Sequence, residues 1–222
     1  MSGGSDPAPA GRSARMDELA PGLWHWTAFR DTIGRTVHSA YHAPSRTLID
    51  PMLPEAGLDW FAEHGPPARI VLVNRHHLRH GPRFVERFGC TVHCHEAGLW
   101  DLHDAPVPVQ GFRFGDELAP GVVAHRVAAI CPEEAALHVA GDGGALAVAD
   151  GVIRDDDGQL AFVPDFLLGA DPAGVKRGLA AAYLELAETL EFDALLLAHG
   201  DPQVGGAREA LRAFAAQHAG AA

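Results

Sequence analysis

The stretch that decides the fold is Arg69-Ile-Val-Leu-Val-Asn-Arg-His-His-Leu-Arg-His80. Its first part, residues 69–73, begins with Arg69 and continues as an apolar run after Gly65-Pro66-Pro67, and such a run predicts a strand buried on both faces. Its second part, residues 74–80, places three histidines and two arginines directly after that strand. Because functional side chains are often carried by loops at the ends of strands, we expect this loop to line a site.

Elements of both kinds are predicted on either side of this stretch. Turn residues and apolar patterning give strands, and apolar positions at helical spacing that end at Gly or Pro give helices. The alternation indicates one α/β domain in which helices lie outside a mixed-sheet core. The predicted strands are 23–29, 36–41, 47–50, 69–73, 91–95, 121–129, 136–140, 145–149 and 193–198, and the predicted helices are 54–64, about 81–88, 172–190 and 206–218, with an acidic turn at 155–158.

Two more polar groups follow predicted strands. Asp142 lies in Ala140-Gly-Asp-Gly-Gly144, and His199 comes directly after Leu195-Leu-Leu-Ala198. If the sheets bring these ends to the loop at 74–80, imidazoles and a carboxylate meet at one place. Such a set suits a borderline metal such as zinc.

Composition and charge exclude several classes of protein. The 222 residues carry a net charge of −12, which disfavours binding to nucleic acid and to anionic membranes. No run approaches the ~20 apolar residues that span a bilayer. Residues 1–16 have no apolar signal-peptide region and are expected to be a disordered lead-in to a domain at 17–220. Three cysteines do not form a disulfide framework, so we expect a cytoplasmic protein.

Four short motifs in this order resemble the metallo-β-lactamase superfamily. They are Leu48-Ile-Asp-Pro51, Phe114-Gly-Asp-Glu-Leu118, Ala140-Gly-Asp142 and Ala198-His-Gly-Asp-Pro202, together with the loop at 74–80. The resemblance covers roughly residues 19–217. It implies an αββα sandwich, with two mixed sheets face to face and helices on the outer faces. It also implies a metal-dependent hydrolase.

The family's metal ligands carry over only in part. The resemblance places His77, His80, Asp142 and His199 at ligand positions. Arg75 stands where the family has a histidine, and Arg79 where it has an aspartate. Ile130 or Cys131 stands at a further histidine position, and Cys131 joins the ligands if the register shifts by one. The resemblance therefore implies at most one ion, zinc or another divalent metal.

Two hypotheses about function follow. Because a guanidinium has no lone pair for a metal, Arg75 and Arg79 add positive charge where a cation would lie. In the first hypothesis one metal remains, an ester, thioester or lactone is hydrolysed, and the arginines stabilise the oxyanion. In the second, the arginines pair with Asp142, and the chain is a non-catalytic binding domain without a metal.

Either hypothesis expects a small-molecule partner, and the arginines favour an anionic one. For His77, His80 and His199, metal binding and a polar pocket without metal both remain open. A redox role for Cys90 and Cys94 is disfavoured, because their spacing is Cys-x-x-x-Cys.

Overall fold

One half of the molecule is a seven-stranded sheet, seen in a computed structural model that describes residues 15–155 and 157–219. The strands lie in sequence order, β1 to β7. Neighbours are antiparallel from β1 to β4 and parallel from β4 to β7. The strands are β1 (Asp17–Ala20), β2 (Leu23–Arg30), β3 (Arg35–His42), β4 (Thr47–Ile49), β5 (Arg69–Leu72), β6 (Thr91–His95) and β7 (Val109–Phe112).

A six-stranded sheet packs against the first, with the order β15-β14-β11-β10-β9-β8. The pair β11 and β14 is parallel, and the other neighbours are antiparallel. A separate hairpin, β12 and β13, follows β11 in the chain. The bounds are β8 (Glu117–Ala119), β9 (Val122–Arg126), β10 (Ala135–Val139), β11 (Ala145–Val148), β12 (Val152–Arg154), β13 (Leu160–Phe162), β14 (Ala194–Leu197) and β15 (Gln203–Val204).

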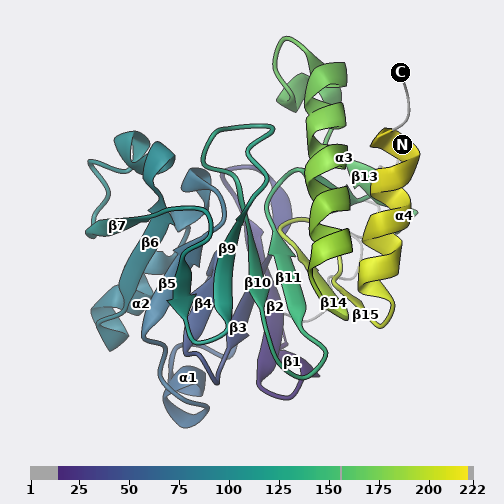
Figure 1. Cartoon of the computed structure of the whole chain (residues 1–222). Coiled ribbons are helices and arrows are strands. Elements are labelled where there is room, and N and C mark those ends of the chain that lie inside the picture. Colours follow the sequence, from purple (N-terminus) through teal and green to yellow (C-terminus); the bar gives the residue numbers. More distant parts are fainter. Residues whose placement is uncertain (1–14, 156, 220–222) are drawn as a thin grey trace, which may run out of the picture.

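Helices cover the outer faces of both sheets. Helices α1 (Asp59–Glu63) and α2 (Gly81–Phe88) lie on the side of the seven-stranded sheet, and α3 (Pro172–Thr189) and α4 (Ala207–Ala219) on the side of the six-stranded sheet (Figure 1). Short 3₁₀ helices are η1 (Arg75–Leu78), η2 (Glu96–Asp101) and η3 (Asp165–Leu167). The predicted αββα sandwich of two mixed sheets is confirmed. No helix within residues 15–155 and 157–219 has the length and apolar character needed to cross a bilayer.

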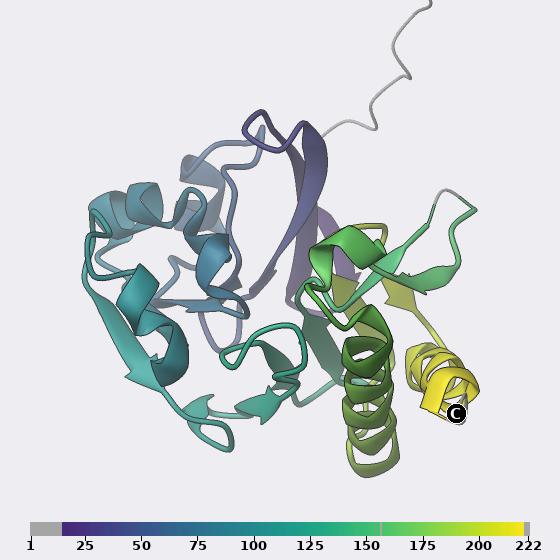
Figure 2. The same cartoon turned by 90° about the horizontal axis from the view of Figure 1, so that it is seen from above.

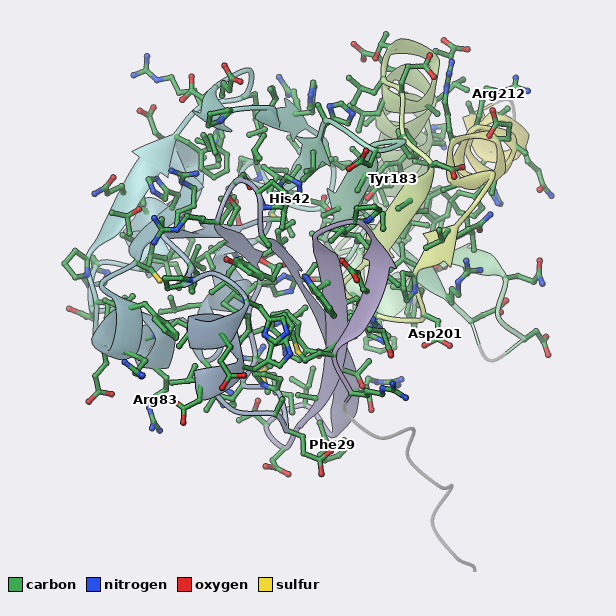
Figure 3. All side chains as sticks on the ribbon, turned by 90° about the horizontal axis from the view of Figure 1, so that it is seen from below. Phe29, His42, Arg83, Tyr183, Asp201 and Arg212 are labelled. Atoms are coloured by element: carbon green, nitrogen blue, oxygen red, sulfur yellow. The ribbon has the colours of Figure 1, made fainter. Side chains whose placement is uncertain are left out.

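Three apolar layers hold the sandwich together. Small and branched side chains such as Val71, Leu137 and Leu196 fill the space between the sheets. Larger rings, among them Trp26 of β2 and Phe61 of α1, pack between the seven-stranded sheet and its helices. A third layer joins the six-stranded sheet to α3 and α4. Burial of each large apolar side chain stabilises the fold by roughly 1.5–3 kcal/mol. Charged residues such as Arg83 and Arg212 lie at the periphery (Figure 3).

The limits of the helices agree with the local sequence, with one exception. Asp171 accepts a hydrogen bond from Gly174 N at 2.9 Å, and Pro172 occupies the first turn, so α3 begins where predicted. The predicted helix at 54–64 is shorter and covers only Asp59–Glu63. Gly57, at φ +75°, has a left-handed backbone that interrupts the helix. A disordered lead-in was expected at residues 1–16. Residues 1–14 of it lie outside the part of the chain that the structure describes, which begins at Arg15.

The carboxyl ends of strands from both sheets meet at one edge, here called the carboxyl edge. It is formed by the ends of β4, β5, β11 and β14. Two backbone bonds join the sheets there: His38 N donates to Ala198 O at 3.1 Å, and Ala135 N donates to Val73 O at 3.0 Å. The loop that follows β5 therefore lies beside the residues that follow β11 and β14. Polar side chains from distant parts of the sequence are brought together at this edge.

Candidate functional site

A buried carboxylate and a buried imidazole form the centre of the carboxyl edge. Asp50 follows β4, and His77 lies in η1 directly after β5. Asp50 Oδ2 lies 2.7 Å from His77 Nδ1, and Asp50 Oδ1 accepts a hydrogen bond from Val73 N at 3.0 Å. Because Asp50 is held by the backbone of the neighbouring strand end, it fixes the orientation of the His77 ring.

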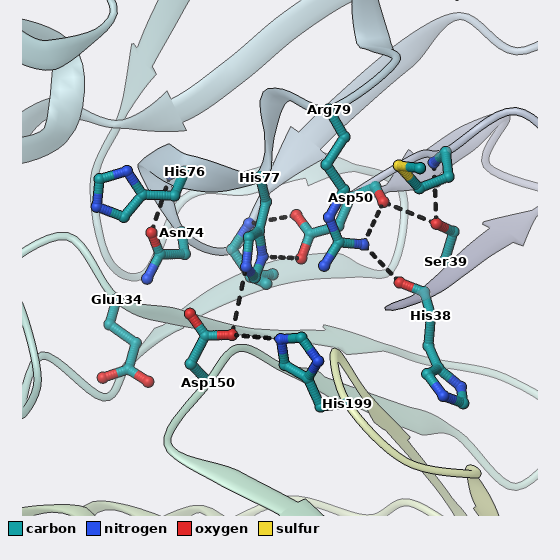
Figure 4. A network of polar contacts seen from close by, with 12 residues as sticks. His38, Ser39, Asp50, Asn74, His76, His77, Arg79, Glu134, Asp150 and His199 are labelled. Atoms are coloured by element: carbon teal, nitrogen blue, oxygen red, sulfur yellow. Dashed lines mark hydrogen bonds and ion pairs between the residues drawn. The ribbon is translucent and has the colours of Figure 1, made fainter. Parts of the chain in front are cut away.

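Asp150 joins the two halves of the molecule at this edge. It follows β11, and its Oδ1 lies 3.3 Å from His77 Nε2 and 3.4 Å from His199 Nε2. His199 follows β14, which runs parallel to β11, so both residues leave the sheet in the same direction. Figure 4 shows the resulting row of side chains, in which Asp50, His77, Asp150 and His199 follow one another.

The charges in this row support one another. Burial alone lowers the pKa of His77, but Asp50 and Asp150 outweigh that effect and raise it to about 9. Burial alone raises the pKa of Asp150, but the charge of His77 and contacts with both imidazoles hold it well below its usual value. At neutral pH, His77 is therefore an imidazolium between two carboxylates.

Arg79 occupies the next place in the row. Its Nη1 donates to the carbonyl oxygens of His38 at 2.6 Å and of Asp50 at 2.8 Å. Within residues 15–155 and 157–219, its buried Nε and Nη2 have no hydrogen-bond partner. Burial lowers the pKa of Arg79, and the charges of Asp50 and Asp150 oppose that change. The guanidinium is thus a fixed cation beside the two carboxylates.

Arg75 is engaged in a different group of side chains. It forms an ion pair with the buried Glu133, and its Nε lies 3.4 Å from Asp101 Oδ2. Its guanidinium carbon lies 5.4 Å from the centre of the Trp100 ring. The hypothesis that Arg75 and Arg79 pair with Asp142 is therefore wrong: the partners are Glu133 and Asp101 for Arg75, and carbonyls beside Asp50 for Arg79.

Asp142 is not part of this site. It lies exposed, at φ +39°, in the turn between β10 and β11. That turn precedes β11, whereas the carboxyl edge follows it, so Asp142 and Asp150 lie at opposite ends of one strand. The candidate carboxylate is therefore Asp150, and Asp142 is removed from the set that the sequence predicted. The end of the predicted strand 145–149 was the signal that could have identified Asp150.

His80 and Cys131, two other predicted ligands, lie near the site. Among the described residues, neither forms a hydrogen bond or an ion pair with Asp150. His80 Nδ1 accepts a hydrogen bond from Leu53 N at 2.9 Å, which holds the ring against the chain after β4. Cys131 lies 3.7 Å from Asn74 Nδ2, and burial raises the pKa of its thiol to about 11. Of the predicted ligands, the structure brings together His77 and His199.

Two buried glutamates were missed by sequence reasoning. Glu133 compensates the charge of Arg75. Glu134 accepts hydrogen bonds from Ile130 N at 3.2 Å and Gly151 N at 3.1 Å, and burial raises its pKa to about 7. Both lie shortly before the predicted strand 136–140. Nothing in the local pattern distinguishes them from exposed glutamates.

Solved structures resemble the fold of this protein over most of the chain. The DIM-1 metallo-β-lactamase has a TM-score of 0.66 and 10% identity, with 93% of this chain and 98% of that chain covered. A metallo-β-lactamase from Pontibacter korlensis has a TM-score of 0.65 and 13% identity, with 91% and 98% covered. A metallo-β-lactamase family protein from Thermus thermophilus has a TM-score of 0.62 and 17% identity, with 90% and 80% covered.

The chain has the metallo-β-lactamase fold. At these identities the likeness concerns the fold alone, since fold does not determine function. No family model matches the sequence, and no curated protein matches it either.

The residues at the carboxyl edge do not fit the metal that this fold implies. Within residues 15–155 and 157–219, no three His, Cys, Asp or Glu side chains are arranged to hold one ion. Both ring nitrogens of His77 face carboxylates, which keep the ring protonated and leave it no lone pair. Arg79 places a second cation beside Asp50 and Asp150. The carboxylates of Asp50 and Asp150 therefore interact with the protein's own cations, His77 and Arg79, rather than forming a set of metal donors.

Proposed function

We propose that this chain is a metal-independent binding domain for a small molecule, in which fixed cations take the place of the metal of the metallo-β-lactamase fold. The observation that carries the proposal is the position of Arg79, whose buried guanidinium donates to the carbonyls of His38 and Asp50. This proposal separates the chain from the metallo-β-lactamases that it resembles in fold.

Charge balance supports it. Asp50 and Asp150 carry two negative charges, and His77 and Arg79 carry two positive charges at the same place. A divalent cation brought into this network would meet two cations at short range. Buried charges are stabilised when they are paired, and here His77 lies against both carboxylates while Arg79 lies close enough to attract them. The carboxylates therefore have little left to offer a metal.

A metal-dependent hydrolase is the second candidate. The names of the neighbours in fold favour it, and so does the placement of Asp150 within 3.3–3.4 Å of two imidazole nitrogens. A metal at this position would need His77 to lose its proton, because only the neutral ring is a ligand. A metal ion there would also be repelled by the guanidinium of Arg79, unless that side chain moved away.

Metal analysis separates the two candidates. We expect protein purified without chelator to contain far less than one equivalent of metal, and we expect added zinc to leave its melting temperature unchanged. About one bound equivalent, with a zinc-dependent rise in melting temperature that His77→Ala and His199→Ala abolish, would reject the proposal.

A second experiment restores the metal-donating residues of the family and asks whether the variant gains zinc binding. We expect the triple variant Arg75→His, Arg79→Asp, Ile130→His to bind zinc, because it removes two cations and adds three donors. Arg83→Asp on α2 is the control, since its side chain is 61% exposed and forms an ion pair with Glu86 on the same helix. Zinc binding by this control would show that the effect comes from surface charge.

A further inference from the structure

The outer strand β7 leaves one edge of the seven-stranded sheet unprotected. Edge strands present unpaired N–H and C=O groups, and proteins commonly protect them with charged residues or keep them very short. Of the four outer strands that the structure describes in the two large sheets, β1 carries Asp17 and Glu18, β8 has three residues and begins with Glu117, and β15 has two residues. By contrast, β7 is the four-residue stretch Val109–Phe112, which has no charged residue. Its edge is therefore open to a further strand.

Two views at right angles show the position of β7. In both, the strand lies at the outer left of the molecule (Figure 1, Figure 2). On its inner side it pairs in parallel with β6, where Val92 faces Val109 and His95 faces Phe112. Phe112 is buried, whereas Gln110 is exposed, as is the glycine that follows it. The middle of the strand is therefore accessible to a partner.

An apolar groove lies directly beside this edge. Its volume is about 400 Å³, and η2, the loop after η2 and the first residue of β7 line it. Leu99, Leu102, Val107 and Val109 belong to the apolar layer between the sheet and its helices, but they are only partly buried. A strand added to a sheet places every second side chain on the same face. The groove can therefore receive apolar side chains of a strand that pairs with β7.

The charges next to β7 favour a second copy of the chain as that partner. Residues 105–112 carry no charge, and the first charged residues on either side are Asp104 and Arg113. Their side chains are 89% and 74% exposed, and each has a partner at the surface, His103 and Glu96. In an antiparallel pair of two β7 strands, Arg113 of each copy approaches Asp104 of the other, whereas a parallel pair would bring like charges together. An antiparallel contact between two identical edges is therefore matched in charge.

We propose that two copies of this chain associate through antiparallel pairing of their β7 strands, so that their seven-stranded sheets form one continuous sheet. A two-fold axis perpendicular to the sheet keeps both grooves on the same face, where the segment Val107–Val109 of each copy packs against the groove of the other. Pro106 and Pro108 have no N–H to donate, so they limit the pairing to β7. Because the described part of each copy offers one such edge, the assembly closes as a dimer. The inference is independent of the proposed function, since it uses none of the charged side chains of the carboxyl edge.

Sedimentation velocity over a range of concentrations tests the association of the full chain. We expect a concentration-dependent equilibrium between monomer and dimer. Gln110→Lys should weaken the dimer at least about tenfold, because it places two like charges at the centre of the pairing. Val204→Lys is the matched control, at a neutral side chain 50% exposed on the outer strand β15 of the other sheet, and should leave the dimer unchanged. A chain that is monomeric at every concentration, or a dimer that both substitutions weaken equally, would overturn the inference.

A mixing experiment separates loss of pairing from loss of folding. We expect Gln110→Lys and Gln110→Asp to keep the melting temperature of the dilute unsubstituted chain, because the side chain is exposed, and each to be mostly monomeric. Mixed in equal amounts, the two variants should form a heterodimer, since opposite charges then meet at the centre of the pairing. A mixture that remains monomeric would mean that the two Gln110 side chains do not approach each other, and would overturn the inference.

Hydrogen exchange identifies the strand that forms the contact. The amides of β7 should exchange more slowly in the concentrated dimer than in the dilute monomer, whereas those of β1 should exchange equally in both. A dimer that protects β1 or β8 instead would contradict the proposal. A chain that stays monomeric, and whose β7 is protected by a synthetic peptide of residues 105–113, would mean that the edge receives a peptide strand and not a second copy, which would also overturn it.

Discussion

Asp150 Oδ1 lies 3.3 Å from Nε2 of His77, whose Nδ1 lies 2.7 Å from Asp50 Oδ2. One imidazole thus bridges two carboxylates that come from different sheets. Asp50 follows β4 of the seven-stranded sheet, and Asp150 follows β11 of the six-stranded sheet. The bridge joins the two halves of the sandwich electrostatically.

Removal of the Arg79 charge is expected to destabilise the protein. In Arg79→Met the carbonyls of His38 and Asp50 lose a buried donor, and the nearby carboxylates lose a cation. Breaking a buried charged network of this kind costs about 3 kcal/mol or more. Urea denaturation measures the free energy of unfolding. Arg83→Met, at an exposed arginine, should change it by less than about 0.5 kcal/mol. Equal effects of the two substitutions would contradict the proposed role of Arg79.

Asp142 and Asp150 are expected to behave differently. Asp142→Asn should change the free energy of unfolding by less than about 0.5 kcal/mol, because the side chain is exposed and asparagine tolerates a positive φ. Asp150→Asn leaves the His77 imidazolium with one carboxylate instead of two, and should cost about 2 kcal/mol. Thermal or urea unfolding of both variants checks this. A larger loss for Asp142→Asn would mean that the assignment to Asp150 is wrong.

Stability is expected to fall in alkaline solution. The pKa of His77 is raised from 6.5 to about 9 in the folded protein. A raised pKa contributes stability that is complete below pH 6.5 and is lost as the pH rises through about 9. The melting temperature should therefore decline between about pH 7 and pH 10, by an amount that His77→Gln reduces. His76→Gln, at the neighbouring histidine that is 58% exposed, should keep the decline. An identical pH profile for His77→Gln would contradict the bridge.

A separate loss of stability is expected in acid. His25 Nε2 lies 2.9 Å from His38 Nδ1 in the interior, and burial lowers the pKa of both rings, that of His38 to about 3. A lowered pKa contributes stability that is present above pH 6.5 and is lost as the pH falls below it. The double variant His25→Gln, His38→Gln should flatten this part of the melting-temperature profile. His103→Gln, at a side chain 70% exposed, is the control. If the double variant and the control give the same acid profile, the buried pair does not account for the loss.

The sequence by itself determined the main elements and their order. The apolar run at 70–73 and the start of α3 at Asp171-Pro172 are decided by neighbours along the chain, because burial pattern and helix caps act over a few positions. The order of four short motifs then indicated the fold. His77 and His199 became candidates because the loop at 74–80 and residue 199 follow predicted strands and because the resemblance places both at ligand positions.

Only the tertiary structure decided which charges meet. Asp142 and Asp150 both flank β11, and the difference between them is the direction in which that strand runs relative to β14 and β5. Likewise, Arg75 pairs with Glu133 and Asp101, which are distant from it in sequence. Arg79 donates to the carbonyls of His38 and Asp50, which are also distant in sequence. Electrostatic pairing depends on distance in space and on burial, and neither is fixed until the two sheets pack.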